Sequence, residues 1–269
     1  MTNYRKTTDN RQQRLVIRVS RSSLSFSTTR GTDVDYLLYP LKASISIAAN
    51  LREALRTEEI LNDEYARVLV MVDSPVLMIP TPLFQEAEQE TLYRHAFTTN
   101  DQLTVMNTVV PDLNAVAVFA IQKDLRTVIT DTFPQARIAA AIAPVWRHLH
   151  ERSYTGQRQK LYGYFHDGKV DVLNFGQNRF KYFNTFDVSN ADDALFFLLA
   201  VWKQLGLVAE HDELHLVGDF AQRDALMEQM QTFVKRVFYI NPSGEFNRSP
   251  ITQIASMPYD LITLYIKGR

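Results

Sequence analysis

Aspartate and glycine stand side by side at two places in this chain, in Asp167-Gly168 and in Gly218-Asp219. Glycine lets a backbone approach a phosphate closely, and a carboxylate can hold the magnesium ion of a nucleotide. Phosphoryl-transfer sites therefore use such residues at hairpin turns and at strand ends. Another carboxylate, Asp73, follows the apolar run at 68–72. Nucleotide binding is thus the first hypothesis to test.

Other catalytic chemistry has little support. Cysteine is absent, which excludes disulfides, thiolate nucleophiles and cysteine-ligated metals. His148 and His150 diverge by about 200° on an expected helix, and His211 and His215 lack an acidic pattern that would complete a zinc site. Neither a Gly-x-Ser-x-Gly elbow nor a glycine-rich P-loop occurs. We expect no metal site and no catalytic residue.

The elements predicted around Asp167-Gly168 and Gly218-Asp219, in the second half of the chain, follow a clear order. Three strands, a helix and a strand are predicted at 161–165, 170–175, 180–186, 191–205 and 213–217. A further helix at 221–235 and a strand at 236–240 complete the pattern. Asp-Gly is a favoured two-residue hairpin turn, so the ordinary interpretation of Asp167-Gly168 is structural.

The same order occurs earlier, because residues 14–73 correspond to 160–219 at a constant displacement of 146 positions. The first half contains alternating strands around Arg21-Ser22-Ser23, a third strand at 33–41, a helix that Ser44 can cap, and a buried strand at 68–72. An insertion is expected at about 74–112, with a strand at 76–79 and a helix starting near Pro82. An apolar strand at 115–121, a helix at 122–131 and a short strand at 136–140 follow. We expect two domains, 1–135 and 136–269.

The helix at 191–205 is apolar nearly all round, which predicts cover on more than one side. Phe197 and Trp202 lie on opposite flanks of this helix. Both are therefore expected to be almost fully buried.

Composition limits the class of partner. Hydrophobic residues make up 46% of the chain, charged residues 22%, and the formal net charge is −1. This balance gives no global attraction to nucleic acid or anionic lipid, so we expect no nucleic-acid partner. The segment 1–14 lacks the apolar core of a signal peptide, and no uncharged run approaches the roughly 18 residues that span a bilayer. We expect a cytoplasmic protein without a membrane span.

A set of short motifs is similar to the actin-like ATPase fold of sugar kinases, 70-kDa chaperones and actin. The whole chain resembles a bacterial family of about this length, a domain of unknown function with that fold. The residues that carry the resemblance are Pro80 with Leu83-Phe84, Phe133-Pro134, Asn184 with Phe186, Asp193 with Phe196-Phe197, Leu205-Gly206-Leu207, and Gly218. The resemblance implies an α/β fold in the ribonuclease H-like class, with two βββαβαβ domains around a cleft.

The fold's nucleotide motifs are altered here. The superfamily carries Asp-x-Gly at the first hairpin of each half, where this chain has Arg18 and Ser20, and then Tyr164 and His166. The later glycine pair is reduced to Gly218-Asp219. Arginine cannot hold magnesium. This departure disfavours ATP and magnesium as cofactors.

Two functional hypotheses follow. The first is a non-catalytic module that binds an unknown protein partner. The alternative is a nucleotide-binding switch or ATP-dependent phosphotransferase with a rearranged site in the cleft. Its candidate cofactor-binding residues are Arg21, Ser22, Ser23, Asp167, Gly168, Lys169 and Gly218.

Overall fold

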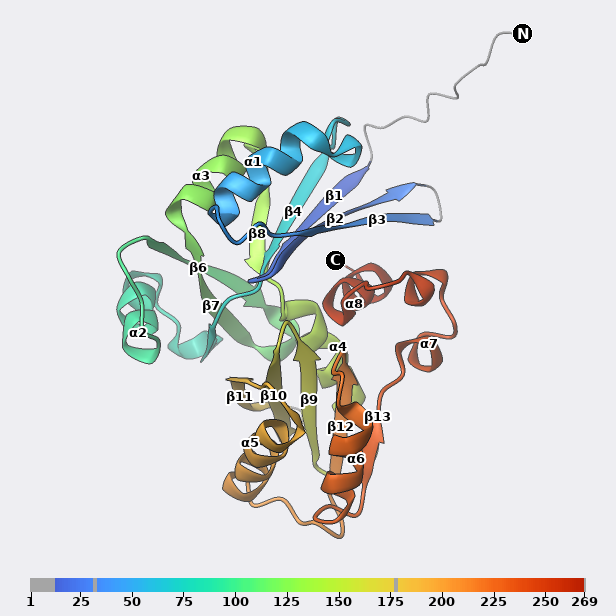
Figure 1. Ribbon diagram of the computed structural model, residues 1–269. Helices are drawn as coiled ribbons and strands as arrows, with labels where there is room; N and C mark the ends of the chain where they lie inside the picture. Colours follow the sequence, from blue (N-terminus) through green and yellow to red (C-terminus); the bar gives the residue numbers. More distant parts are fainter. Residues whose placement is uncertain (1–12, 31–32, 177–178, 269) are drawn as a thin grey trace, which may run out of the picture. The chain divides into compact units, whose positions relative to one another are not determined.

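The computed structural model describes residues 13–30, 33–176 and 179–268 (Figure 1). The chain divides into two compact units. The first holds Met1–Val109 and Val116–Ala141, and the second holds Val110–Ala115 and Ile142–Arg269. The N-terminal stretch for which no signal peptide is expected lies mostly outside the described residues.

Each unit is built on a five-stranded sheet with the same strand order. The first sheet has the order β3-β2-β1-β4-β8 and the second β11-β10-β9-β12-β13. In both, the first three strands form an antiparallel meander, and the last two run parallel to the first strand. The α/β fold predicted from the sequence is confirmed. The strands of the first sheet are β1 (Arg14–Val19), β2 (Ser23–Arg30), β3 (Asp33–Pro40), β4 (Arg67–Val72) and β8 (Arg137–Ala140), and those of the second are β9 (Lys160–His166), β10 (Lys169–Gly176), β11 (Arg179–Asp187), β12 (Glu213–Gly218) and β13 (Val237–Tyr239).

Helices pack against each other in pairs within each unit. In the first unit α1 contacts α3; in the second α5 contacts α6, and α4 contacts α8. Asn190 caps α5 as expected, accepting a hydrogen bond from Asp193 N–H, whereas Ser46 rather than Ser44 caps α1. The helices are α1 (Ile47–Thr57), α2 (Gln89–Ala96), α3 (Lys123–Thr132), α4 (Ala143–Ser153), α5 (Ala191–Gln204), α6 (Arg223–Gln231), α7 (Pro242–Glu245) and α8 (Tyr259–Lys267).

The first unit extends past residue 135, where the sequence places the domain boundary. Strand β8 pairs in parallel with β4, from Leu69↔Arg137 to Val72↔Ala140. Without β8 the βββαβαβ pattern of the first unit would lack its last strand. The compact unit accordingly runs to Ala141.

The inserted segment forms a three-stranded sheet in the order β5-β7-β6, so it runs past its expected end near residue 112 and includes β7. Its strands are β5 (Val76–Pro80), β6 (Leu103–Val110) and β7 (Ala115–Gln122). Tyr93 of α2 packs with Val116 and Val118 of β7 in a small core. The expected helix exists as α2, but its predicted start near Pro82 is wrong, because short 3-10 turns occupy Thr81–Leu83 and Glu86–Glu88 and α2 begins only at Gln89.

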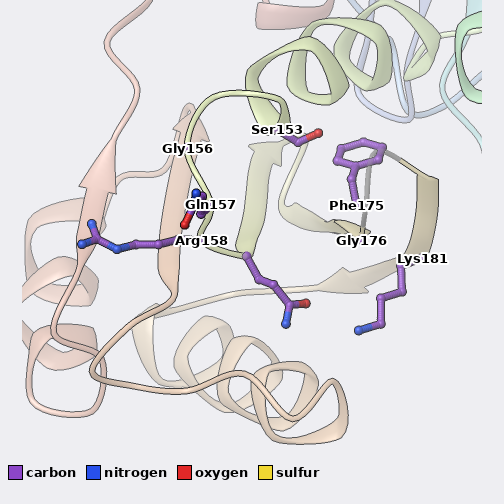
Figure 2. Close-up of a pocket in the computed structure, with 8 residues that line it drawn as sticks. Ser153, Gly156, Gln157, Arg158, Phe175, Gly176 and Lys181 are labelled. Carbon is purple, nitrogen blue, oxygen red and sulfur yellow. The ribbon is translucent and has the colours of Figure 1, made fainter.

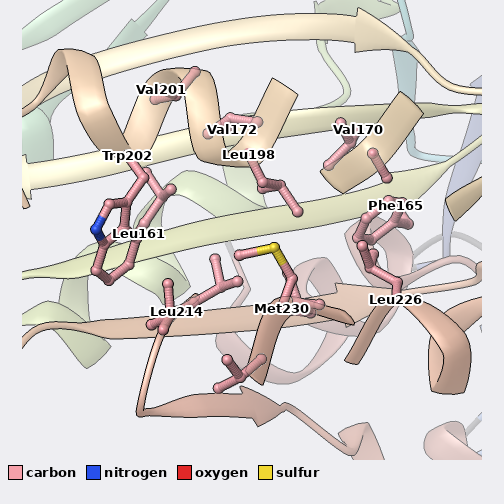
Figure 3. Packing of buried hydrophobic residues seen from close by; sticks show 14 of the residues in the cluster. Leu161, Phe165, Val170, Val172, Leu198, Val201, Trp202, Leu214, Leu226 and Met230 are labelled. Atoms are coloured by element: carbon pink, nitrogen blue, oxygen red, sulfur yellow. The ribbon is translucent and has the colours of Figure 1, made fainter. Parts of the chain in front are cut away.

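The main core of the second unit lies between its sheet and the pair α5 and α6. Leu198, Val201 and Trp202 of α5 face Leu161 and Val172 of the sheet, while α6 adds Leu226 and Met230 (Figure 3). Trp202 is 6% exposed, so its predicted burial is confirmed.

The prediction for Phe197 is wrong. Phe197 is only half-buried and its neighbour Phe196 is 66% exposed. One flank of α5 packs on the sheet, and the described structure places too little over the opposite flank to bury its phenylalanines. The apolar helix α5 therefore exposes the flank that carries Phe196 and Phe197. Within the described part of the chain, no helix has the length and apolar character needed to cross a membrane.

Candidate functional site

The first group of predicted site residues lies at the turn between β1 and β2. Ser20 is buried, and its Oγ accepts hydrogen bonds from Ser23 N–H at 3.2 Å and from Ser22 N–H at 3.4 Å. The Ser20 N–H donates to Ser23 O at 2.9 Å. Arg21 and Ser22 are exposed. Backbone N–H groups that a phosphate would need at this turn are thus engaged by the turn's own serine.

The second turn, Asp167-Gly168, joins β9 to β10. Both residues have positive φ, 47° and 72°, and His166 pairs with Lys169. These angles are those of a two-residue type I′ hairpin, which favours Asp-Gly. The Gly168 carbonyl accepts a hydrogen bond from Val188 N–H at 3.0 Å. The local geometry is therefore explained by the hairpin itself.

Gly218 ends β12 in a conformation that only glycine accommodates. Its φ is 98°, and a Cβ at this position would lie 2.0 Å from the carbonyl oxygen of Phe165. The same oxygen accepts the Asp219 N–H at 3.0 Å. The Gly218 carbonyl accepts the Tyr239 hydroxyl at 3.1 Å. The close approach of the Gly218 backbone to β9 therefore explains why glycine is needed at this position, without a ligand.

The predicted residues thus form two groups. Gly218 pairs with Phe165, immediately before His166, so Gly218 and the Asp167–Lys169 turn lie at one end of the second sheet. Arg21, Ser22 and Ser23 belong to the first unit.

Sequence analysis missed a buried network beside the second turn. His166 Nε2 lies 2.9 Å from Asp171 Oδ2, and the Thr185 hydroxyl donates to Asp171 Oδ1 at 2.6 Å. His166 Nδ1 lies 3.2 Å from Asp167 Oδ2. The signal was available, because a two-residue turn pairing His166 with Lys169 puts Asp171 diagonally beside His166 on the same face.

The network belongs to a wider buried polar layer on the sheet face that bears Tyr162, Tyr164 and His166. Tyr164 stacks on His166 with ring centroids 4.4 Å apart, and Tyr162 lies 5.5 Å from the His215 ring. Helices α4 and α8 contribute to it, since the Tyr259 ring lies within 6.0 Å of both Tyr164 and His148. The buried members of this polar layer are His148, His150, Tyr162, Tyr164, His166, Asp171, His215 and Tyr259.

Burial shifts the pKa of two histidines and two tyrosines of the layer toward the uncharged form. It lowers the pKa of His148 to about 4 despite the carboxylate of Glu245, whose Oε1 lies 3.1 Å from His148 Nε2. Burial also lowers the pKa of His215 and raises the pKa of the Tyr162 and Tyr259 hydroxyls. Neutral imidazoles and phenols suit a packed interior. With these shifts, His148, His215, Tyr162 and Tyr259 are not a general acid and base poised near pH 7.

Comparison with known families places the chain. Residues 3–237 match the family described as "Protein of unknown function (DUF3822)". The chain belongs to this family. No curated protein matches it.

Solved structures give this DUF3822 chain its fold class. A structure from Bacteroides thetaiotaomicron VPI-5482, described as a protein with actin-like ATPase fold and unknown function, is 28% identical and has a TM-score of 0.83; the match covers 93% of this chain and 99% of that one. A PilM-PilN type IV pilus biogenesis complex matches at 12% identity and a TM-score of 0.57, covering 94% and 96% of the two chains. The actin-like ATPase fold implied by the sequence motifs is confirmed.

The DUF3822 chain has a surface pocket of about 520 Å³ at the far end of β9 and β10 (Figure 2). The side chain of Arg158 leads away from Phe175 and Lys181 in Figure 2. It pairs with Glu213 at 3.3 Å. The two cationic groups therefore do not converge on one anion. The pocket is lined by Ser153, Gly156, Gln157, Arg158, Gln159, Phe175, Gly176 and Lys181.

The buried imidazole of His148 predicts that this DUF3822 protein loses stability in acid. The unfolded chain takes up the proton at the ordinary pKa of 6.5, and the folded chain at about 4. Between these values the unfolded state binds more protons, so the contribution is complete above pH 6.5 and is lost as pH falls toward 4. The loss is on the order of 3 kcal/mol. Urea unfolding of wild type and His148→Phe at pH 7 and pH 4.5 measures it.

The variant should show a shallower decline than wild type over this range. His211 is exposed. His211→Gln is therefore the matched control and should follow wild type. Equal pH dependence in wild type and His148→Phe would contradict the burial of a neutral imidazole.

Proposed function

We propose that this DUF3822 protein is a cytoplasmic, non-catalytic protein-interaction module, in which the nucleotide motifs of the actin-like fold are degenerate. The observation that carries the proposal is Ser20. Its hydroxyl takes the N–H groups of Ser22 and Ser23 that a phosphate would otherwise engage. A nucleotide would have to break these bonds before it gained its own.

The other altered positions support the same conclusion. Arg18 stands where the fold family carries the first acid, and it is 2% exposed. A guanidinium cannot coordinate magnesium. Gly218 is required by the close approach to Phe165, and Asp219 follows it where a second glycine would let a phosphate approach. A carboxylate at that place repels phosphate unless a metal intervenes.

Protein binding is supported by the uncovered flank of α5, since large exposed apolar side chains on a soluble protein mark interaction surfaces. The fold has a precedent in this role, because the PilM-PilN structure is a complex of two pilus-biogenesis proteins. The alternative of a rearranged nucleotide site is the outcome that the next experiment can establish.

Purified protein is expected to release no phosphate from ATP above background, with or without magnesium. Thermal unfolding with millimolar ATP or ADP should show no shift, whereas a ligand at 100 times its dissociation constant would stabilise the fold by about 2.7 kcal/mol. Asp73→Ala, measured in parallel, tests the carboxylate that follows the apolar strand at 68–72. Magnesium-dependent turnover that disappears in Asp73→Ala would overturn the proposal and make Asp73 catalytic.

A further inference from the structure

The uncovered flank of α5 adjoins the free edge of the second sheet. Phe186 of β11 stacks on Phe197 with ring centroids 4.5 Å apart and an interplanar angle of 15°, and Phe197 meets Phe196 at 5.3 Å. We call Tyr182 and Phe186 of β11 together with Phe196 and Phe197 of α5 the aromatic edge. Tyr182, Phe186 and Phe197 are each partly exposed, and Phe196 is the most open.

β11 is an edge strand, and in the described part of the chain its ladder partner is β10. The ladder is regular from Lys169↔Asp187 to Asn174↔Tyr182. The Val188 N–H donates to Gly168 O at 3.0 Å, and N–H groups alternate in direction along an antiparallel strand. The N–H groups of Phe183 and Thr185 therefore point away from β10.

The bond made by Thr185 agrees with this alternation. Its N–H donates to Asn184 Oδ1 at 2.9 Å, so a side chain of the same strand satisfies it. This local bond can be exchanged for one to an added strand. Alternate side chains of that strand would lie on the face of α5, against Phe186 and Phe196.

The fold does not require aromatic residues here. In the first unit α1 holds the place that α5 holds in the second, between the third and fourth strands, and its exposed positions include Arg52 and Arg56. The corresponding edge strand β3 carries aspartates and ends at Pro40, features that protect an edge from pairing.

The charges beside the aromatic edge select the partner. Arg179 and Lys181 of β11 are exposed, and neither forms an ion pair with another described residue. Lys203, near the end of α5, is also exposed. Exposed cations favour a segment that carries apolar side chains and also acidic ones where it meets Arg179 and Lys181, whereas the exposed Asp187, next to Phe186, disfavours acids at the other end of β11.

We propose that the aromatic edge binds an extended segment of a partner protein, in which apolar residues alternate with aspartate or glutamate, by adding it as a strand to β11. The inference rests on the proposed interaction function and names its surface and partner class. Main-chain bonds to β11 provide the register, Phe196 and Phe186 take the apolar side chains, and Arg179 and Lys181 pair with the acids.

A random dodecapeptide library displayed on phage is the probe, selected on the wild-type protein. Enriched peptides should alternate apolar and acidic residues. Fluorescence anisotropy with the synthetic peptide should then show at least tenfold weaker binding for Phe196→Ser and for Lys181→Glu. Arg52→Ser, at an exposed site on α1, is the matched control and should bind as wild type. All three replaced side chains are exposed, and a thermal melt checks that each variant is folded.

Two further arms test the strand geometry and the charge. Asn184→Ala removes the local acceptor of Thr185 N–H and should tighten binding, whereas docking through side chains alone would leave the affinity unchanged. Lys181→Glu should prefer a peptide with lysine in place of its acids. An empty selection, peptides that bind the Phe196→Ser variant equally well, or unchanged affinity in Asn184→Ala would overturn the inference.

Failure of this surface and failure of the proposed function give different results. ATP turnover by the same preparations would contradict the proposed non-catalytic function. It would not affect the result of the peptide-binding experiment, which tests the surface on its own. Sedimentation of the free protein distinguishes self-association, since a dimer that Phe196→Ser dissociates would assign the surface to a second copy and overturn the partner proposed here.

Discussion

Gly218→Ala is expected to destabilise the second unit by at least about 3 kcal/mol. The added Cβ would lie 2.0 Å from the Phe165 carbonyl oxygen, far inside van der Waals contact. The backbone φ of 98° is itself unfavourable for an L side chain, by about 1–2 kcal/mol. Relief requires β12 to move away from β9, which would disturb the Asp219 N–H bond to the same oxygen.

Tryptophan fluorescence in urea isolates this effect. The chain has two tryptophans, Trp146 and Trp202, and both belong to the second unit. Their emission therefore reports that unit even if the two units unfold separately, a case in which a single global free energy of unfolding is not defined.

Gly206→Ala separates the clash from the backbone angle. Gly206 has a φ of 65°, and no atom lies within 4 Å of the position its Cβ would take. Its replacement should cost only about 1–2 kcal/mol. Equal stability of Gly218→Ala and Gly206→Ala would disprove the close approach of Gly218 to Phe165. A ligand-binding role would then again be a possible reason for glycine at position 218.

Local backbone chemistry was the most predictable part of this protein. Asp167-Gly168 specifies a hairpin turn through its own tolerance of positive φ, and the structure has that turn. The same reasoning identified Gly218 as a position that needs glycine, but it did not identify the physical reason. A glycine that admits a phosphate and a glycine that admits a neighbouring carbonyl look alike in sequence, and only the position of Phe165 distinguishes them.

Sheet membership was harder to predict because it depends on distant partners. The run at 115–121 is fully apolar and was expected as a strand, which β7 confirms. Its apolar character could not show that β7 lies between β5 and β6 in the inserted sheet. The short strand β8 was expected too, but its pairing with β4 assigns it to the first unit.

Side-chain surroundings were the least predictable. Phe196 and Leu198 are equally apolar, yet one is 66% exposed and the other fully buried. Hydrophobicity alone cannot reveal an uncovered flank. The pairing of His166 with Asp171 could have been derived from the hairpin register, whereas the approach of Tyr259 to this layer depends on α8, about a hundred residues later.

Trp146→Ala is the second large effect, with an expected loss of about 3–5 kcal/mol. Trp146 of α4 is fully buried. Its ring meets Phe183 of β11 edge-on, with centroids 4.9 Å apart at 85°, and Phe180 at 6.4 Å. Truncation leaves a cavity and removes the support that α4 gives to β11. Urea unfolding followed through the remaining Trp202 measures the loss.

Trp146→Phe is the matched control for this change. Among the described residues the Trp146 Nε1 has no hydrogen-bond partner, so phenylalanine removes no polar bond and retains most of the aromatic contact. Its cost should be well below that of Trp146→Ala, because a much smaller volume is vacated. Because Phe180 and Phe183 flank Lys181 on the same strand, a folded Trp146→Ala protein should also bind the selected acidic peptide more weakly than Trp146→Phe. Equal stability of the two variants would show that the indole does not support β11.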